Sequence, residues 1–151
     1  MTAVDRESPL PIRPARADDY DGILSVWSAA GLSFRPGYRD SKERFQRQLQ
    51  RFPALYLVAA DGDRVVGVVL GSHDERKGWI NRLAVLPQYR RRGLAAALVE
   101  ACEAAIRADG IEIVAALIES DNLPSCRLFE NLGYRDDVPV RYYRKLSHPG
   151  A

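Results

Sequence analysis

The sequence contains little that would suggest a secreted, membrane-spanning or metal-binding protein. It has two cysteines, Cys102 and Cys126, and neither lies in a Cys/His cluster, which disfavours a disulfide framework and a zinc site. No apolar run approaches the roughly 18 residues of a membrane span, and the first residues lack the apolar core of a secretory signal. We therefore expect a cytoplasmic protein with no membrane segment and no metal.

An excess of charge of either sign is also missing. The 151 residues include 22 basic and 20 acidic side chains, a formal net charge of +2, which is too balanced to favour nucleic-acid binding through overall charge. A composition of 46% hydrophobic and 28% charged residues is typical of a domain with one core. We predict a single domain over residues 11–147, between a flexible N-terminus (1–10) and a short tail (148–151).

Hydrophobic periodicity and turn residues predict a mixed α/β fold. Pro14 indicates that the first strand lies at a sheet edge, and Asp40 with Glu43 forms a predicted capping box. The expected order is a strand at 12–15, helices beginning near Asp18 and Asp40, a hairpin of strands at 55–60 and 64–70, a strand at 79–85, a helix at 93–108, a strand at 111–118 covered on both faces, a short helix between Asn122 and Gly133, and a strand at 140–146. This order predicts a central, mostly antiparallel sheet covered by helices.

Between the third of the central strands and the long helix, the chain passes through an arginine-rich turn. Arg90, Arg91 and Arg92 precede Gly93, after which the helix begins. A helix N-terminus carries unpaired N–H donors and a partial charge of about +0.5, and a glycine without a Cβ lets a ligand approach the backbone. The turn therefore predicts a phosphate site, although such a turn alone is more often a solvated basic surface.

Two sequence blocks together resemble the GNAT superfamily of N-acetyltransferases. Arg90-x-x-Gly93-x-Ala95 resembles the superfamily's acyl-coenzyme A pyrophosphate loop, and residues 122–134, from Asn122 to Tyr134, resemble its second conserved block. With the element order, the resemblance covers residues 12–146. It implies a GNAT-type fold and transfer of an acetyl group from acetyl-CoA, the cosubstrate, to a primary amine of a small molecule or a protein, by direct attack in a ternary complex.

The resemblance also assigns residues to the cofactor. The pyrophosphate would meet the main-chain N–H groups of the loop, and the pantetheine arm would pair with the preceding strand and touch the second block. The implied cofactor-binding residues are Arg90, Arg91, Arg92, Gly93, Leu94 and Ala95 in the loop, Leu83, Ala84 and Val85 in the strand, and Asn122, Ser125 and Phe129 in the second block. Asn122 could equally act only as a helix cap.

The catalytic groups are less clear from the sequence. Glu119 is the first candidate for the general base, with Asp121 as an alternative, and Asn81 could orient a water. Phe129 stands where the superfamily commonly has a tyrosine that protonates the leaving thiolate. Tyr134 is the chosen substitute acid.

Further candidates complete this set: Tyr142 and Tyr143 as acids, with core packing as their alternative role, and His73 and Glu75 in a turn that could border the cleft.

By the same resemblance, the loop between the first two helices would receive the acceptor. Phe34, Arg35, Tyr38 and Arg39 in this loop suit an acidic or aromatic acceptor. Because Phe129 lacks a hydroxyl, a non-catalytic acyl-CoA binding or sensing module is the alternative function. Nucleic-acid binding through Arg90 to Arg92 is disfavoured by the near-neutral net charge. The sequence leaves open whether the chain forms a homodimer.

Overall fold

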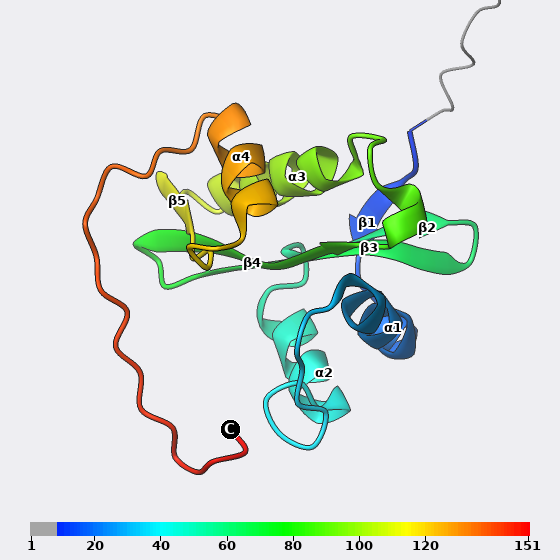
Figure 1. Ribbon diagram of the computed structural model, residues 1–151. Coiled ribbons are helices and arrows are strands. Elements are labelled where there is room, and N and C mark those ends of the chain that lie inside the picture. Colours follow the sequence, from blue (N-terminus) through cyan, green and yellow to red (C-terminus); the bar gives the residue numbers. More distant parts are fainter. Residues whose placement is uncertain (1–8) are drawn as a thin grey trace, which may run out of the picture.

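The computed structural model describes residues 9–151 and shows a five-stranded sheet with helices on both faces (Figure 1). The elements in chain order are β1 (Ile12–Pro14), the 3-10 helix η1 (Ala17–Asp19), α1 (Tyr20–Ala30), α2 (Lys42–Arg51), β2 (Tyr56–Asp61), β3 (Arg64–His73), β4 (Lys77–Val85), the 3-10 helix η2 (Pro87–Tyr89), α3 (Leu94–Ala108), β5 (Ile113–Ala116) and α4 (Leu123–Asn131). Most of the N-terminus expected to be flexible, positions 1–8, lies outside the described residues.

The strands follow one another across the sheet in the order β1-β2-β3-β4-β5. Every neighbouring pair is antiparallel except β4 and β5, which are parallel. The helices α1 and α2 cover one face of the sheet, and α3 and α4 cover the other (Figure 1). The predicted mixed sheet, mostly antiparallel and covered by helices, is confirmed, as is the edge position of the strand that contains Pro14.

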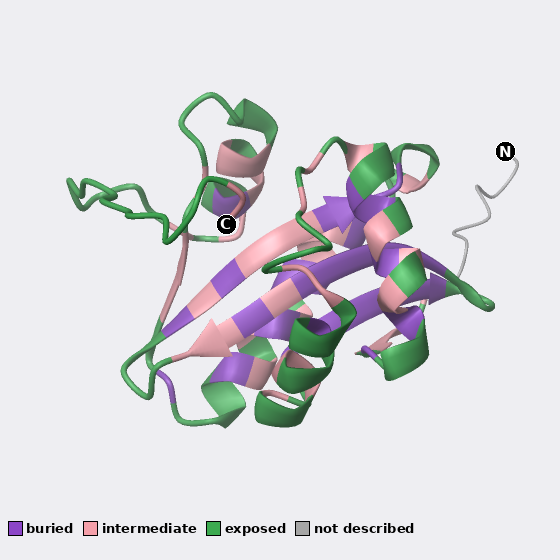
Figure 2. Cartoon of the chain, turned by 90° about the horizontal axis from the view of Figure 1, so that it is seen from below, coloured by how far each residue is buried: buried purple, intermediate pink, exposed green. Residues whose placement is uncertain are grey.

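Cover on both faces explains the apolar runs of the central strands. Val58 of β2 and Val66, Val68 and Val69 of β3 have no exposed surface. A strand that packs against helices on both sides cannot alternate polar and apolar residues, because each side chain reaches a core. In Figure 2 the middle of the sheet is accordingly drawn as buried on successive residues.

The helix α3 lies unusually close to the sheet because glycines face it. Three of its residues, each four positions apart and therefore on one face, sit over three strand glycines: Leu98 over Gly67, Cys102 over Gly71 and Ile106 over Gly78. A Cβ at Gly71 would lie 2.6 Å from Cys102 Sγ, closer than real contacts allow. The glycines thus set both the distance of α3 from the sheet and its position along the strands.

Two local predictions concern a hairpin turn and a helix cap. The hairpin turn between β2 and β3 is confirmed, with Gly62 at a φ of 58°. The predicted Asp40–Glu43 capping box is wrong by one residue, because Ser41 is the N-cap of α2 and its hydroxyl accepts from Arg44 N at 3.3 Å. Asp40 instead closes the preceding loop, where its carboxylate accepts from Arg35 N at 2.7 Å.

The C-terminal half departs further from the predicted strands. The strand β5 has four residues instead of the expected eight, and Ile113 is 54% exposed, so β5 is not covered on both faces. The predicted strand at 140–146 is not formed. Residues 138–146 instead run extended and exposed from the α4 side of the sheet to the α2 side (Figures 1 and 2).

Among residues 9–151, no helix has the length and apolar character needed to cross a bilayer. The same residues contain no group of three or more His, Cys, Asp or Glu side chains placed to hold a metal ion. Both cysteines are free thiols, with Cys102 buried in α3 and Cys126 half-buried in α4.

The glycine row gives a first prediction. Substituting Gly71→Ala should lower the free energy of unfolding by about 1–3 kcal/mol, because the new methyl group overpacks the contact with Cys102. Urea denaturation followed by circular dichroism measures this. Adding Cys102→Ala should recover part of the loss. Gly37→Ala, at a position with open space and no positive φ, is the matched control. A loss no larger than that of the control would contradict the proposed close contact.

Candidate functional site

The loop from β4 to α3 forms a concave backbone surface. The φ angle is positive at Arg91 (63°) and at Gly93 (75°) but not at Arg92. Alternating backbone hands of this kind turn successive N–H groups toward one side, and the first N–H groups of α3 have no acceptor within the helix. Residues 90–93 are all exposed. The predicted phosphate loop therefore has an accessible set of donors.

Contacts with the neighbouring hairpin hold this loop in place. The Tyr89 hydroxyl donates to Asp61 Oδ2 at 2.5 Å, and this hydrogen bond raises the pKa of Tyr89. The Arg92 guanidinium lies over the Tyr89 ring, 5.0 Å from its centroid. At the start of the loop, Leu86 N donates to Val66 O of β3 at 2.9 Å. The loop is thus fixed before any ligand arrives.

The two parallel strands separate on the way to this loop. Their pairing ends at Ile80 and Ala116, whereas β4 continues to Val85. The separation coincides with a bulge, where the register between β3 and β4 shifts and Arg82 has a φ of 56°. Beyond it, Ala84 and Val85 pair only with β3. The backbone of Leu83, Ala84 and Val85 therefore faces an opening on its β5 side.

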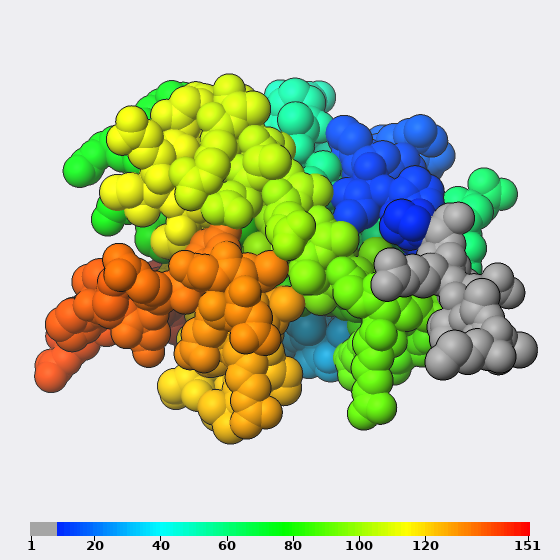
Figure 3. All heavy atoms as spheres, turned by 90° about the horizontal axis from the view of Figure 1, so that it is seen from above, coloured from blue at the N-terminus to red at the C-terminus, as the bar shows by residue number. Residues whose placement is uncertain are grey.

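The surface is indented above this opening. Seen from the side of α3 and α4, the space-filling view shows a recess between the β4–α3 loop and α4 (Figure 3). Atoms with the colour of α1 and the loop that follows it are visible at the floor of the recess. One edge of the recess thus carries the phosphate-type loop, and the α1–α2 loop lies on the opposite side of the sheet.

Arg82 at the bulge ties the sheet to the α1–α2 loop and was not among the predicted site residues. Its guanidinium stacks 4.2 Å from the Trp27 ring centroid and donates to Ser33 O at 2.9 Å. Burial lowers its pKa, while the nearby Asp40 carboxylate acts in the opposite direction. Arg82 Nε and Trp27 Nε1 are buried donors without a partner among the described residues. The sequence shows an arginine in a strand, but not the bulge that turns it toward α1.

The α1–α2 loop, predicted to receive the acceptor, is ordered by several contacts. Phe34 packs on Trp27 with a ring-centroid distance of 6.1 Å, so it anchors the loop. Arg35 and Tyr38 have exposed side chains, and Tyr38 stacks on His148 at 4.7 Å. Arg39 lies 3.5 Å from the Asp40 carboxylate. Arg35, Tyr38 and Arg39 therefore all have side chains that a bound molecule can reach.

In the second sequence block, the capping role of Asn122 is directly visible. Its Oδ1 accepts from Ser125 N at 3.3 Å and caps α4. Phe129 is buried and meets the Tyr134 ring edge-on at 5.0 Å. The Tyr134 hydroxyl is buried without a hydrogen-bond partner among the described residues, and burial raises its pKa to about 12. Tyr134 consequently keeps its proton at any physiological pH.

The candidate bases lie on either side of the opening between the strands. Asn81 is half-buried, directly after the last residue of β4 that pairs with β5. Glu119 and Asp121 are exposed in the loop from β5 to α4, where Glu119 O accepts from Asn122 N at 2.9 Å. The β4 side of the opening therefore carries an amide that can bind water, and the β5–α4 loop on the other side carries carboxylates that can bind a proton.

Four alternatives from the sequence are misplaced. His73 pairs with Gly78, at the opposite end of β4 from the phosphate-type loop, and its Nε2 lies 3.1 Å from Asp109 Oδ2. Glu75 lies in the same turn, so neither residue borders the opening. Tyr142 and Tyr143 are 72% and 83% exposed on the C-terminal segment and belong neither to the core nor to the site.

An opened pair of parallel strands beside a fixed anion loop is suited to a ligand that has an amide-containing arm and phosphate groups. The chain belongs to the acetyltransferase (GNAT) family, whose pattern matches residues 23–134. An acetyltransferase of Sodalis glossinidius is 33% identical over 125 residues, which are 83% of this chain and 87% of that protein. The class expected from the sequence, an N-acetyltransferase, is confirmed.

Solved structures share the fold. The PaiA N-acetyltransferase of Thermoplasma acidophilum, in complex with coenzyme A, superposes with a TM-score of 0.71 at 18% identity, covering 85% of this chain and 91% of that one. AAC(6')-Iy, in complex with the bisubstrate analogue CoA-S-monomethyl-acetylneamine, gives a TM-score of 0.75 at 19% identity, covering 92% of this chain and 99% of that one. At these identities the likeness concerns the fold alone.

The position of Arg82 gives a second prediction. Arg82→Met keeps the apolar stem but removes the stack on Trp27 and the bond to Ser33 O. It should cost about 1–2 kcal/mol of stability and speed amide hydrogen exchange in residues 31–41. Mass spectrometry of hydrogen exchange measures this, with Arg35→Met as the control on an exposed side chain of the same loop. Unchanged exchange in the loop would show that Arg82 does not anchor it.

Proposed function

We propose that the protein transfers an acetyl group from acetyl-CoA to a primary amine by direct attack in a ternary complex. The observation that carries this proposal is the backbone of Leu83, Ala84 and Val85, which has no partner strand on its β5 side and leads straight into the concave loop at the start of α3. An amide-containing arm can hydrogen-bond to this strand edge while its phosphates meet the N–H groups of the loop. Because the chain belongs to the acetyltransferase (GNAT) family, acetyl-CoA is the ligand with such an arm and such phosphates.

In the loop, both backbone N–H groups and side chains are proposed to interact with the pyrophosphate. The N–H groups of Arg91, Arg92, Gly93, Leu94 and Ala95 contact the pyrophosphate in this proposal, and the exposed Arg90 adds positive charge. On the α4 side, Asn122 uses its carbonyl oxygen for the cap, so its amide nitrogen is available to the pantetheine arm. Ser125 and Phe129 follow on the same helix and are the other α4 residues proposed to contact the pantetheine arm.

Acetyl-CoA supplies an activated thioester, and the residues must deliver a neutral amine to it. For a lysine-like amine of pKa about 10.4, deprotonation at pH 7 costs about 4–5 kcal/mol, whereas an α-amine near pKa 8 costs about 1 kcal/mol. Glu119 is the proposed base, and its exposed carboxylate can take the proton through water. Asn81, on the other side of the opening, orients that water.

The leaving thiolate has to be protonated without the usual tyrosine. Phe129 carries no proton, and Tyr134 packs against it with a protonated, unpartnered hydroxyl. We assign Tyr134 as the acid. Solvent is the second source, because a thiol of pKa about 8.5 is already a fair leaving group. The missing hydroxyl also favours one alternative function, a non-catalytic acyl-CoA sensing module.

The acceptor is a small molecule or a protein amino group that approaches from the α1–α2 loop. Arg35 and Tyr38 are the exposed residues proposed to contact it, and Phe34 holds the loop on Trp27. A guanidinium and a phenol ring suit an acceptor with an acidic or aromatic group near its amine. A panel of such amines, followed by release of the free thiol, identifies the substrate class.

Gly93→Glu tests the cofactor site and is the third prediction. A side chain at a φ of 75° is strained, and the carboxylate would face the phosphates, so the affinity for acetyl-CoA should fall at least about 100-fold by calorimetry. Gly110→Glu, at a φ of 88° beyond the other end of α3, carries the same strain and charge away from the loop and serves as the control. Equal affinity of both variants for acetyl-CoA would show that the loop is not part of the cofactor site.

Phe129→Tyr tests the protonation step and is the fourth prediction. If lack of an acid limits the rate, the new hydroxyl should raise turnover about tenfold or more. Steady-state kinetics with the best amine of the panel measures this, and Tyr134→Phe should lower turnover in the wild-type background. An unchanged rate in Phe129→Tyr would show that protonation is not limiting. Tight acetyl-CoA binding with no transfer to any amine would favour the sensing module.

A further inference from the structure

Arg82 carries a positive charge that no carboxylate neutralises by contact. The residue is half-buried, and no described residue forms an ion pair with it. Asp40 attracts it from a distance, but the Asp40 carboxylate already accepts from Arg35 N at 2.7 Å and lies 3.5 Å from Arg39 Nε. Arg39 acts on Arg82 as a like charge. Because a half-buried guanidinium is unfavourable when it is unpaired, this charge favours an anionic ligand.

Much of the hydrogen-bonding capacity of Arg82 is also unused. A guanidinium has five N–H donors in one plane. In Arg82, Nη2 donates to Ser33 O at 2.9 Å, and Nε is buried without a partner among the described residues. The guanidinium carbon lies over the Trp27 ring, 4.2 Å from its centroid. An arginine that stacks on a ring in this way keeps its N–H edges for partners in its own plane.

Arg82 also joins the strand assigned to the cofactor to the α1–α2 loop. It directly precedes Leu83, where the backbone without a partner on the β5 side begins, and neighbouring strand residues are about 3.3 Å apart. Its side chain reaches Trp27 and Ser33 on the α1 side of the sheet. Figure 3 shows atoms with the colour of α1 and the following loop at the floor of the recess. An amine that reaches a thioester at this strand is therefore within one side-chain length of the Arg82 guanidinium.

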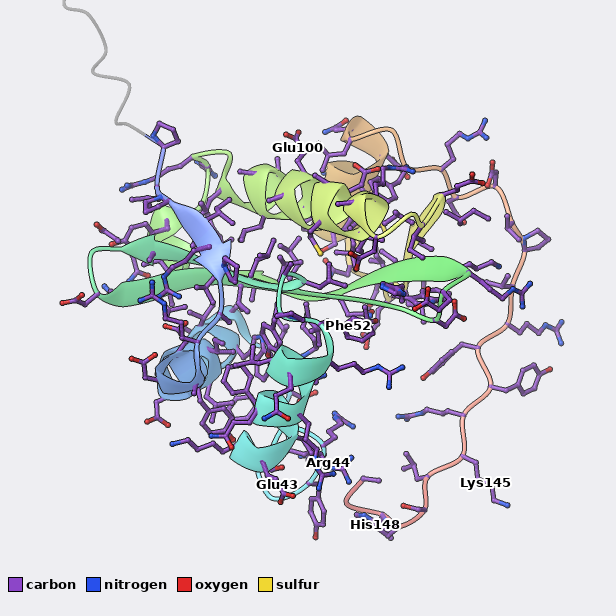
Figure 4. The ribbon with its side chains drawn as sticks, turned by 180° about the vertical axis from the view of Figure 1, so that it is seen from behind. Glu43, Arg44, Phe52, Glu100, Lys145 and His148 are labelled. Carbon is purple, nitrogen blue, oxygen red and sulfur yellow. The ribbon has the colours of Figure 1, made fainter. Side chains whose placement is uncertain are left out.

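The side of the α1–α2 loop that faces away from the sheet is occupied differently. There His148 stacks on Tyr38 at a ring-centroid distance of 4.7 Å. Figure 4 shows His148 and Arg44 together at the start of α2, on the side away from the sheet. Arg44 is exposed. Arg44 and Arg82 are thus two arginines near one loop, and Arg82 is the one that lies beside the cofactor strand.

We propose that Arg82 binds a carboxylate of the acceptor and that the acceptor is a free amino acid, an inference that rests on the acetyl transfer proposed above. One unpaired guanidinium matches the single charge of a carboxylate, and its planar N–H edge fits the two carboxylate oxygens. A phosphate-type group, with about two negative charges and three oxygens, exceeds what one guanidinium can pair. Because Arg82 lies beside the strand that holds the thioester, the amine and the carboxylate belong to one small molecule.

The acceptor carboxylate is unchanged by the reaction. The amine nitrogen forms an amide bond with the acetyl carbonyl carbon, and the C–S bond of acetyl-CoA breaks. The proton of the amine passes through water to Glu119, and the leaving thiolate takes a proton from Tyr134. The products are an N-acetylated amino acid and coenzyme A, and Arg82 holds the carboxylate throughout.

Matched acceptors test the role of Arg82. Free amino acids are each compared with their α-carboxamides, which keep the amine and the side chain but lack the negative charge, and 2-aminoethylphosphonate supplies a different anion. The carboxylate preference is kcat/KM for the amino acid divided by kcat/KM for its carboxamide. Arg82→Gln should lower this preference about 100-fold, because the carboxylate loses its charged partner. Arg82→Lys keeps the charge but not the planar fork, so it should recover part of the loss.

A preference measured in this way distinguishes recognition from support of the loop. Loosening of the α1–α2 loop in Arg82→Gln affects both acceptors alike, and their amine pKa values do not depend on the enzyme variant, so neither effect changes the comparison between variants. Arg44→Gln removes the same charge on the side away from the sheet and should leave the preference unchanged. An unchanged preference in Arg82→Gln would overturn the proposal. A wild type that prefers the carboxamides or the phosphonate would also overturn it.

Binding measured without transfer keeps this test apart from the test of acetyl transfer. Calorimetry gives the affinity for each amino acid at saturating coenzyme A, which has no acetyl group to donate. Arg82→Gln should raise the Kd of the best-bound amino acid about 100-fold. A wild type that binds an amino acid through Arg82 but acetylates no amine would support the carboxylate site and reject acetyl transfer. Acetylation of amines without any dependence on Arg82 would support acetyl transfer and reject the carboxylate site.

Discussion

The close contact between α3 and the glycines of β3 and β4 is the constraint on which the site depends. Because Gly67, Gly71 and Gly78 have no side chains, the helix lies against the sheet with Cys102 and its neighbours pressed onto the strands. The N-terminus of α3 is thereby fixed in height above the end of β4. A helix that stood higher would carry its N–H donors away from the strand edge that precedes them, and one ligand could not use both.

The opening between β4 and β5 depends on the same arrangement. Parallel pairing needs a crossover, and here α3 is that crossover, so its position also sets where β5 begins. The bulge at Arg82 then lets β4 bend away after Ile80. A strained backbone at this point is compensated by the stack on Trp27 and by the bond to Ser33, which connect β4 to α1 and to the α1–α2 loop.

The parts of the site that could be predicted from the sequence are the local ones. The arginine-rich turn with Gly93 and the block from Asn122 to Tyr134 are contiguous, and both lie where the element order places them. The role of Arg82 depends on a register shift and on an aromatic ring 55 positions earlier in the chain, which no local pattern shows. His73 failed as a candidate for a related reason, because only the pairing of β3 with β4 shows which end of the strand it occupies. The segment at 140–146 has the composition of a strand, but composition does not show that it pairs with none of the described strands.

The packing of Trp27 has a practical consequence for observing the protein at work. Its indole is 4% exposed, lies under the Arg82 guanidinium and touches Phe34 of the α1–α2 loop. The other tryptophan, Trp79, lies in β4 opposite Ala115, three positions before Arg82. Indole emission responds to a nearby cation and to the polarity of its surroundings. The chain therefore contains an intrinsic fluorophore whose signal reports rearrangement of the α1–α2 loop, without any added label.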